Sequence, residues 1–257
     1  MTTLAYLETL ARQAGEILHS GFGMHHQVNH KGIIDLVTEM DHRSEAFLLG
    51  EIQRRYPQHA IITEESGVLS GQDSCKWYID PLDGTVNYAH GVPIFSVSIA
   101  YAENGTVRLG VVFDPMQNEC FSAEQGQGAR LNGQSIHVSG AQELDQSLLV
   151  TGFAYDIRTN PQNNLDHYRR FALASQGVRR LGSAALDLSY VAAGRFDGYW
   201  ELSLNSWDIA AGGLIAQEAG ALVTTIDGDP DYVSPPYSIL AATPAVHPQM
   251  LNKLYNT

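Results

Sequence analysis

The feature that most constrains this chain is a short strand that runs directly into an acidic turn. Alternation and aromatic bulk from Lys76 to Ile79 predict the strand. We expect it to stop at Asp80, because Pro81 cannot donate a hydrogen bond to a neighbouring strand. The fold must hold this strand end and its turn in one place, which makes the turn the first candidate for a functional site.

The turn itself carries groups that suit a metal ion and a phosphate. Asp80 and Asp83 supply hard oxygen ligands of the kind that Mg²⁺ prefers. Gly84 allows the backbone to come close to a ligand, and the free amides at the start of a short helix after Thr85 would attract an anion. A plain surface turn is the alternative, since Asp, Pro and Gly are all common in turns.

Three further acidic residues are expected at the ends of strands or helices. A short strand from His59 to Thr63 should end at Glu64. Asp41 is expected to begin a helix, where a role as N-cap would explain it without any chemistry. Asp208 is expected to open another helix in the second half of the chain. Ligands of α/β proteins bind at such edges, so these residues join the turn as candidates.

Hydrophobic periodicity divides the chain into two lobes. In the first lobe, a helix from about Leu4 to Ser20 and a run of strands predict helices packed on an antiparallel sheet, with strands at 94–101, 106–113, 119–123 and 135–138. In the second lobe, strands at 148–152, 198–202 and 221–226 alternate with helices at 168–175, 184–193 and 209–219, which favours an α/β arrangement. We expect residues 1–257 to form a single catalytic unit, with lobes at about 1–140 and 141–257.

Charge and composition exclude several classes of protein. The 257 residues include 15 Lys and Arg against 28 Asp and Glu, and the net charge of −13 argues against direct binding to nucleic acid or to a membrane. Cys75 and Cys120 form neither a disulfide framework nor a zinc site, which favours a cytoplasmic protein. We see no signal peptide and no segment with the apolar length of a membrane span.

Four of the acidic residues could be gathered only with the help of cations, and these are Glu64, Asp80, Asp83 and Asp208. At about 4 Å, each like-charged pair costs on the order of 4 kcal/mol at an effective dielectric constant of about 20. Two or three Mg²⁺ ions would reverse the sign of the site and let a phosphate dianion approach. Acidic oxygen ligands without a Cys or His pattern favour Mg²⁺ over zinc.

Four motifs appear in order along nearly the whole chain. They are Lys31…Asp35-Leu36-Val37-Thr38…Asp41, Glu64-Glu65-Ser66, Asp80-Pro81-Leu82-Asp83-Gly84-Thr85 and Trp207-Asp208-Ile209-Ala210-Ala211-Gly212. Together they closely resemble the motifs of the inositol monophosphatase family, the Mg²⁺-dependent, lithium-sensitive phosphatase superfamily. The resemblance implies a layered αβαβα sandwich, usually dimeric, with two to three Mg²⁺ ions in each active site.

The resemblance implies a set of metal ligands. Glu64, Asp80 and the carbonyl of Leu82 would bind the first Mg²⁺, which activates the attacking water. Asp80, Asp83 and Asp208 would bind the second, which stabilises the leaving oxygen. A third, weaker ion would also use Glu64. Hydrolysis of phosphate monoesters needs acceleration by up to about 10²¹-fold, and paired metal ions roughly 3.5–4 Å apart supply both the nucleophile and the charge neutralisation.

The resemblance also assigns catalytic and substrate-binding roles. Thr85 and Asp41 match the pair that orients the nucleophilic water, so Glu64, Thr85 and Asp41 are the implied catalytic residues. The implied substrate contacts are Asp83, Gly84, Thr85, Gly182, Ser183, Ala184, Glu201 and Asp208, with the amides of Gly84 and Thr85 holding the phosphate. The chain contains no G-x-S-x-G motif and no P-loop, which favours direct attack by water.

The implied activity is that of a Mg²⁺-dependent phosphomonoesterase acting on a small polyol or sugar phosphate, with inositol 1-phosphate as the leading substrate and a homodimer as the expected assembly. Fructose-1,6-bisphosphate and histidinol phosphate remain alternative substrates, because pocket loops decide that choice. Some members of the family also act as regulatory RNA-binding or transcription-complex partners. A catalytically inactive Mg²⁺-binding protein is a further alternative. The tail Ala241-Ala242-Thr243-Pro244 departs from the family pattern, which commonly has Asn there.

Overall fold

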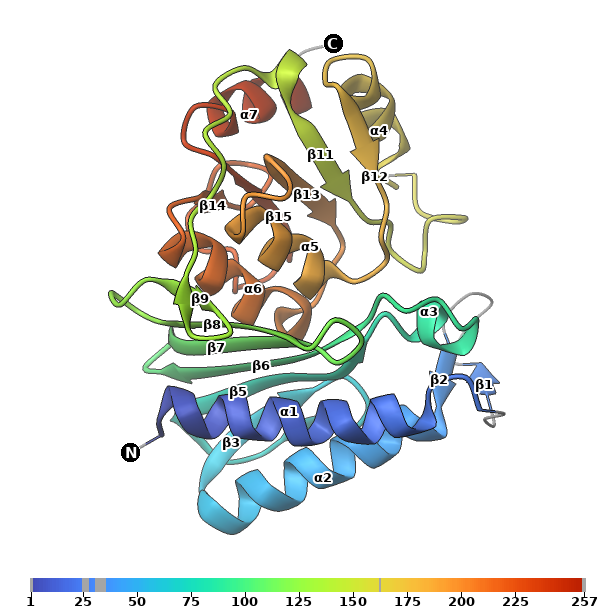
Figure 1. The fold of residues 1–257 in the computed structure, drawn as a ribbon, viewed down its shortest axis with the longest axis vertical. Coiled ribbons are helices and arrows are strands. Elements are labelled where there is room, and N and C mark those ends of the chain that lie inside the picture. Colours follow the sequence, from blue (N-terminus) through green and yellow to red (C-terminus); the bar gives the residue numbers. More distant parts are fainter. Residues whose placement is uncertain (1, 25–27, 31–35, 162, 256–257) are drawn as a thin grey trace.

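Two large β-sheets and the helices around them make up the fold of this computed structural model (Figure 1). The structure describes residues 2–24, 28–30, 36–161 and 163–255. Lys31 and Asp35 of the first motif lie outside the described residues, so any part they play at the site stays a prediction.

The first layer consists of helices α1 (Leu4–Gly21) and α2 (Glu39–Arg55), which lie along one face of the larger sheet (Figure 1). A small ribbon of β1 (Val28–His30) and β2 (Leu36–Thr38) connects them. The predicted first helix is confirmed, and its buried side chains recur at helical spacing; they include Leu7, Leu10, Ala11, Ala14 and Leu18.

The second helix begins two residues earlier than predicted. Thr38, not Asp41, is the N-cap of α2, and Asp41 is the third helical residue. The side chain of Thr38 accepts a hydrogen bond from the helix, while the carboxylate of Asp41 accepts one from the Thr38 amide. This capping box explains the difference, because an acidic residue at the third position supports a helix start as well as one at the cap.

The larger sheet has eight strands and includes the acidic turn. In spatial order the strands are β10 (Gln134–Ser135), β9 (Ala129–Leu131), β8 (Glu119–Glu124), β7 (Thr106–Asp114), β6 (Ser96–Glu103), β5 (Gln72–Asp83), β3 (His59–Thr63) and β4 (Gly67–Leu69). Neighbouring strands are antiparallel except β3 and β5, so the expectation of an antiparallel sheet is wrong for that pair. The predicted strand at 135–138 is also wrong, since the two-residue β10 pairs only at 134 and 135.

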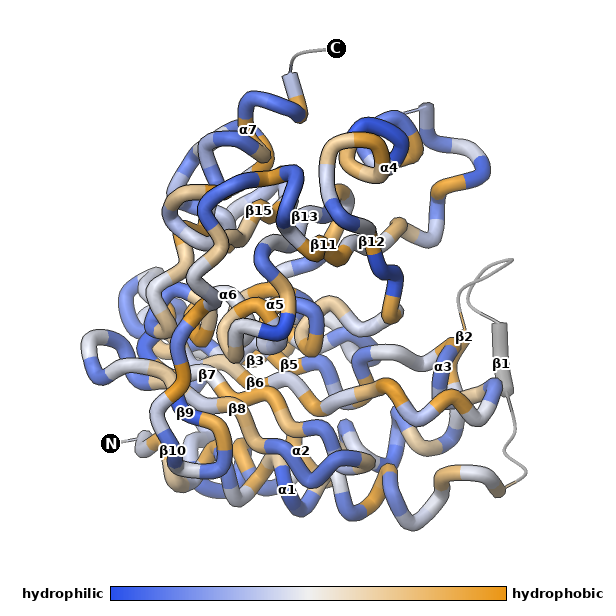
Figure 2. Tube along the Cα trace, turned by 45° about the horizontal axis from the view of Figure 1, so that its top comes forward, coloured by the Kyte–Doolittle hydropathy of each residue, from blue (hydrophilic) through white to orange (hydrophobic). Residues whose placement is uncertain are grey.

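Helices α5 (Ala184–Ala192) and α6 (Ser206–Glu218) lie between the two sheets (Figure 1). Figure 2 shows hydrophobic residues gathered along β6, β7, β8 and α5. One buried cluster joins both sheets to these helices, and its members include Val112, Phe121, Leu188, Ile215, Tyr199 and Ile239. The helix predicted at 209–219 starts at Ser206 instead, because Asn205 is its N-cap and Asp208 is its third residue.

The smaller sheet has five strands. In spatial order they are β12 (Gly177–Arg179), β11 (Leu148–Thr151), β13 (Gly198–Leu202), β15 (Ser238–Ala242) and β14 (Leu222–Thr224). β11 is parallel to β12 and β13, whereas β15 is antiparallel to β13 and β14. β12 and β15 are not among the predicted strands. β12 is short and not fully buried, and a fully buried strand such as β15 shows no alternation of polar and apolar residues.

Helices α4 (Leu165–Ala172) and α7 (His247–Tyr255) cover the outer face of the smaller sheet (Figure 1). They complete the order helix, sheet, helix, sheet, helix, which confirms the expected αβαβα sandwich. α4 begins three residues before the predicted start at 168. Within the described part of the chain, no helix combines the length and the hydropathy needed to cross a membrane.

Candidate active site

One pocket collects nearly all of the predicted site residues. It lies where β3 and β5 end, opposite the first turns of α5 and α6. The predicted residues that line it are Glu64, Asp80, Leu82, Asp83, Gly84, Thr85, Gly182, Ser183, Ala184, Glu201 and Asp208. Asp41 does not line the pocket, but it accepts a hydrogen bond from Thr85, which does. Residues from separate segments between 41 and 208 therefore meet at one place.

A β-bulge shapes the acidic turn. Asp80 pairs with Ser98 and Asp83 with Ser96, so β5 carries one residue more than β6 between these pairs. The prediction that the strand stops at Asp80 is wrong, because the extra residue lets the chain pass Pro81 without a ladder hydrogen bond and pair again. The amide of Leu82 donates to Oδ1 of Asp80 over 3.0 Å, which fixes that carboxylate at the bulge.

The glycine after the bulge is required by its conformation. Gly84 has φ of 102° and is the N-cap of the short helix α3 (Thr85–Ala89), which confirms a brief helical segment here. A Cβ at this position would also lie only 3.0 Å from the carbonyl oxygen of Ile94. Both observations explain why the turn needs a residue without a side chain.

Asp83 links the acidic turn to the start of α5. Its Oδ2 accepts hydrogen bonds from the Ser183 hydroxyl over 2.6 Å and from the Ala185 amide over 2.8 Å. Its Oδ1 lies 3.3 Å from the amide of Ala184, which also donates to it. Ser183 is the N-cap of α5, and its hydroxyl accepts a hydrogen bond from the Leu186 amide over 3.3 Å. The carboxylate at the end of β5 therefore takes part in capping α5, a helix of the neighbouring layer.

Thr85 and Asp41 form the hydrogen-bonded pair that the resemblance implies. The Thr85 hydroxyl donates to Oδ1 of Asp41 over 2.9 Å. Oδ2 of Asp41 accepts from the Thr38 amide over 2.8 Å and from the Thr38 hydroxyl over 2.6 Å. Burial raises the pKa of Asp41, and these hydrogen bonds oppose the rise. Thr38 was not predicted as part of the site, although the spacing Thr-x-x-Asp is itself a capping-box signal.

A buried glutamate holds the second acidic motif in place. Glu45 of α2 accepts a hydrogen bond from the Thr63 hydroxyl over 2.8 Å. It also accepts from the amide and the hydroxyl of Ser66, over 3.0 and 2.7 Å. The turn that carries Glu64 is thereby tied to α2. The sequence patterns did not predict Glu45, because a single acidic residue within a helix gives no signal of its own.

Burial and mutual repulsion perturb the carboxyl groups of the pocket. Desolvation raises the pKa of Asp80 well above its ordinary value, and the charges of Glu64, Asp83 and Asp208 raise it further. Burial has the same effect on the pKa of Asp208, to which Asp83 and Glu64 add. Burial also raises the pKa of Glu201 to about 7. The side chains lie close enough to repel one another, which is what a bound cation would relieve.

The donor atoms fit Mg²⁺ in kind but are not assembled around one point. Among the described residues, no three Asp, Glu, His or Cys side chains are placed so that they could hold an ion together. Instead, Asp83 faces the amides of α5, and Oδ2 of Asp208 accepts from the Asn205 amide over 2.7 Å. Carboxylates and a carbonyl are nevertheless the hard oxygen donors that suit Mg²⁺. Metal binding would therefore require these side chains to turn toward a common ion.

Ten residues that line the pocket were not predicted as site residues. Four lie in the loop after β11, two lie before or on α5, and four follow β13; they are Gly152, Phe153, Ala154, Tyr155, Arg180, Asp187, Ser203, Leu204, Asn205 and Trp207. Asp187 follows the predicted Ser183 by four residues, so helical spacing places both on one face of α5. That spacing is the signal that could have identified it.

The layered fold and the acidic pocket at its strand ends define a protein of the αβαβα class. The model of the inositol monophosphatase family matches residues 1–257, and the chain belongs to that family. The resemblance found in the four sequence motifs is thereby confirmed.

Relatives match this chain over nearly their whole length. The chain is 43% identical over 254 residues to a protein from Pasteurella multocida named Nus factor SuhB, with 95% of this chain and 92% of the relative covered. The inositol monophosphatase of Anabaena (Nostoc) sp. PCC 7120 is 44% identical, with a TM-score of 0.88 and coverage of 98% and 94%. The extragenic suppressor protein suhB of Bartonella henselae is 35% identical, with a TM-score of 0.91 and 97% of each chain covered.

Proposed function

We propose that this protein is a Mg²⁺-dependent phosphomonoesterase that hydrolyses a small polyol phosphate, with inositol 1-phosphate as the preferred substrate. The observation that carries the proposal is the meeting of the acidic motifs in one pocket of a chain from the inositol monophosphatase family. Residues 1–257 act as one catalytic unit in this proposal, and two such chains form the active homodimer.

The proposed metal ligands are those of the acidic turn and its neighbours. One Mg²⁺ would be held by Glu64, Asp80 and the Leu82 carbonyl, and a second by Asp80, Asp83 and Asp208. A third, more weakly bound ion would also use Glu64 as a ligand. Bound Mg²⁺ supplies a water nucleophile at neutral pH and neutralises the charge of the leaving oxygen. The raised pKa of Asp80 supports this arrangement, because the ion supplies the positive charge that the carboxylates lack.

Thr85 and Asp41 orient the attacking water. The Thr85 hydroxyl gives its proton to the hydrogen bond with Asp41, which leaves a lone pair of its oxygen free to accept from a water in the pocket. Thr38 in turn holds the Asp41 carboxylate in one orientation through two hydrogen bonds. When the water transfers a proton to the Thr85 oxygen, the Thr85 hydroxyl proton can move to Oδ1 of Asp41, while a lone pair of the water faces the phosphorus.

The remaining pocket residues hold the substrate. Gly84 and Thr85 line the pocket, and their amides bind phosphate oxygens in this proposal. Ser183, Ala184 and Glu201, with Gly182, Asp83 and Asp208, contact the hydroxyl groups of the polyol. Because the pKa of Glu201 is raised to about 7, this carboxyl can either donate or accept a hydrogen bond near neutral pH.

A phosphate-release screen with Mg²⁺ tests the proposal. The substrates are inositol 1-phosphate, fructose-1,6-bisphosphate, histidinol phosphate and adenosine phosphates. We expect the highest kcat/KM for inositol 1-phosphate, complete loss of turnover in EDTA, and inhibition by millimolar lithium. If one of the other phosphates gave a higher kcat/KM, that compound would replace inositol 1-phosphate as the proposed substrate. If no substrate released phosphate, the proposed phosphatase activity itself would be overturned.

The name of the Pasteurella relative, Nus factor, favours a second candidate function, that of a regulatory binding protein. The net charge of −13 makes a protein partner more compatible with this chain than direct contact with nucleic acid. Affinity capture of the wild-type protein and of Asp83→Asn separates the two functions. Specific partners that are retained equally by both proteins would support a role independent of turnover.

A further inference from the structure

Asp187 is a buried carboxyl group in the pocket that neither the fold nor the proposed chemistry uses. It lies in the first turn of α5 and is 1% exposed, yet it lines the pocket. Its Oδ1 has no hydrogen-bond partner among the described residues. Burying a polar group without a partner costs stability, so a group of this kind calls for a ligand that completes it.

Helix capping does not explain this carboxyl group. The amides that begin α5 are already bonded, those of Ala184 and Ala185 to Asp83 and that of Leu186 to the Ser183 hydroxyl. The amide of Asp187 itself donates to the Ser183 carbonyl over 3.0 Å. The start of the helix therefore leaves no donor for the Asp187 side chain.

The charges around Asp187 are acidic on balance. The charged groups that act on it are Glu201 of β13, Asp83 of β5 and Arg180, and two of these three are acidic. Arg180, the only cation among them, is exposed to solvent. Glu201 is engaged elsewhere, since its Oε2 accepts from the Tyr199 hydroxyl over 2.6 Å. Burial, with the charge of Glu201, raises the pKa of Asp187 well above its ordinary value.

We propose that Asp187 is a further specificity-determining residue of this pocket, which exchanges hydrogen bonds with a hydroxyl group of the polyol substrate. A buried carboxyl group that is neutral donates one hydrogen bond and accepts another, and a hydroxyl group does the same. The inference rests on the proposed function for the identity of the substrate. It adds a contact on α5 beside the strand residue Glu201, so that two carboxyl groups from different layers select a polyhydroxylated molecule.

The test compares three variants with two phosphate esters. Asp187→Leu removes both hydrogen-bonding atoms, Asp187→Asn keeps a donor and an acceptor, and Ser189→Ala is the control, because the Ser189 hydroxyl donates to the Ala185 carbonyl of the same helix. Inositol 1-phosphate carries the hydroxyl groups, whereas p-nitrophenyl phosphate has none on its leaving group. We expect Asp187→Leu to raise KM about tenfold or more for inositol 1-phosphate and to change it less than threefold for p-nitrophenyl phosphate. Asp187→Asn should stay within about threefold of the wild type for both.

Two further measurements separate this role from a structural one. The melting temperature of Asp187→Leu should equal or exceed that of the wild type, because an unpaired buried carboxyl group has been removed. A lower melting temperature with equal losses for both esters would overturn the inference, as would unchanged KM values. Phosphoethanolamine, which carries a cation, tests whether Asp187 binds a cationic ligand instead. The inference would also be overturned if kcat/KM of the wild type were higher for phosphoethanolamine than for inositol 1-phosphate and if Asp187→Leu lost that preference.

Binding of myo-inositol distinguishes failure of the inference from failure of the proposed function. Calorimetry in Mg²⁺ and inorganic phosphate requires no turnover. If the wild type releases no phosphate but binds myo-inositol about tenfold more tightly than Asp187→Leu does, the activity is wrong and the role of Asp187 stands. The inference is overturned if the wild type binds no myo-inositol, or if Asp187→Leu binds it as tightly as the wild type does.

Discussion

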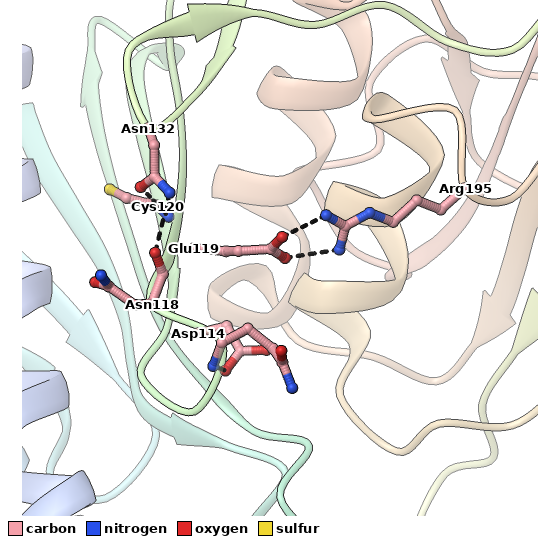
Figure 3. A network of polar contacts seen from close by, with 7 residues as sticks. Asp114, Asn118, Glu119, Cys120, Asn132 and Arg195 are labelled. Atoms are coloured by element: carbon pink, nitrogen blue, oxygen red, sulfur yellow. Dashed lines mark hydrogen bonds and ion pairs between the residues drawn. The ribbon is translucent and has the colours of Figure 1, made fainter.

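Carboxylates in two regions of this molecule meet their partners in different ways. Where the larger sheet faces the segment after α5, Glu119 accepts two hydrogen bonds from Arg195, over 2.6 and 2.5 Å (Figure 3). Close by, Asp114 accepts from two backbone amides of its own turn, over 2.8 and 3.0 Å. In the pocket, by contrast, Asp80, Asp83 and Asp208 form no ion pair with any residue that the structure describes.

This difference distinguishes a structural ion pair, which is complete within the chain, from a site whose acids Asp80, Asp83 and Asp208 lack such a pair among the described residues. Glu119 has its cation within the chain, so the pair is complete when the protein has folded. Asp80 and Asp208 are crowded with other acids, and burial with that crowding raises the pKa of both. Asp41 stands between the two cases, because it lies at the site but both of its oxygens already accept hydrogen bonds. We therefore expect cations at the crowded acids and none at Asp41.

Replacing a crowded acid should have the largest effect. Asp208→Asn removes one charge from the proposed second metal site, and we expect phosphate release from inositol 1-phosphate to fall by about a thousandfold or more. The melting temperature in EDTA should not fall, because repulsion among the carboxylates is reduced. Steady-state kinetics and thermal unfolding measure the two quantities. Near-normal turnover in this variant would remove Asp208 from the metal site.

Adding Mg²⁺ should stabilise the wild type through the same residues. At about 100 times its dissociation constant, a ligand that binds only the folded state adds about 2.7 kcal/mol. For a chain of this size, that corresponds to a rise in melting temperature of roughly 5–10 °C. Asp208→Asn should show a smaller rise, whereas Glu119→Gln should respond like the wild type. An equal response of both variants would mean that the ion binds outside the pocket.

The pH dependence of stability should report the crowded acids without any metal. The folded pKa values of Asp80 and Asp208 are raised, so in EDTA the folded protein keeps protons that the unfolded chain releases as the pH rises above about 4. Their contribution to the free energy of unfolding is full at low pH and is lost as the pH rises through the raised values. Glu201, with a pKa of about 7, extends the loss to neutral pH.

Urea unfolding in EDTA between about pH 5 and 8 measures this dependence. We expect the wild type to lose stability as the pH rises, Asp208→Asn to lose less, and Mg²⁺ to oppose the loss because it binds the deprotonated carboxylates. A free energy of unfolding that increases with pH in EDTA for the wild type would contradict the raised pKa values.

The comparison also marks what the sequence could and could not predict. Asp80 and Asp83 stand next to a recognisable strand and glycine, so local patterns identified them, and the order of four motifs identified the family. The bulge at Pro81 was not predictable, because it depends on the register between β5 and β6. Glu45 gave no local signal, because its contacts with Thr63 and Ser66 join segments far apart in the sequence. Thr38 and Asp187 gave only weak signals, the spacing of a capping box and the spacing of one helix face.

The structural pair should give the smallest effect. Glu119→Gln leaves a neutral side chain opposite Arg195, whose guanidinium also lies 4.7 Å from the ring centre of Tyr190. The side chains of Arg195 and Glu119 remain 38% and 20% exposed, so solvent screens the pair and we expect a loss of about 1 kcal/mol or less. Turnover and the response to Mg²⁺ should not change, because the pair does not line the pocket.

Urea unfolding of Glu119→Gln, Arg195→Lys and the double variant measures the coupling. A change in KM for inositol 1-phosphate would show that this contact positions α5 and its pocket residues, and the division between structural and site carboxylates would fail.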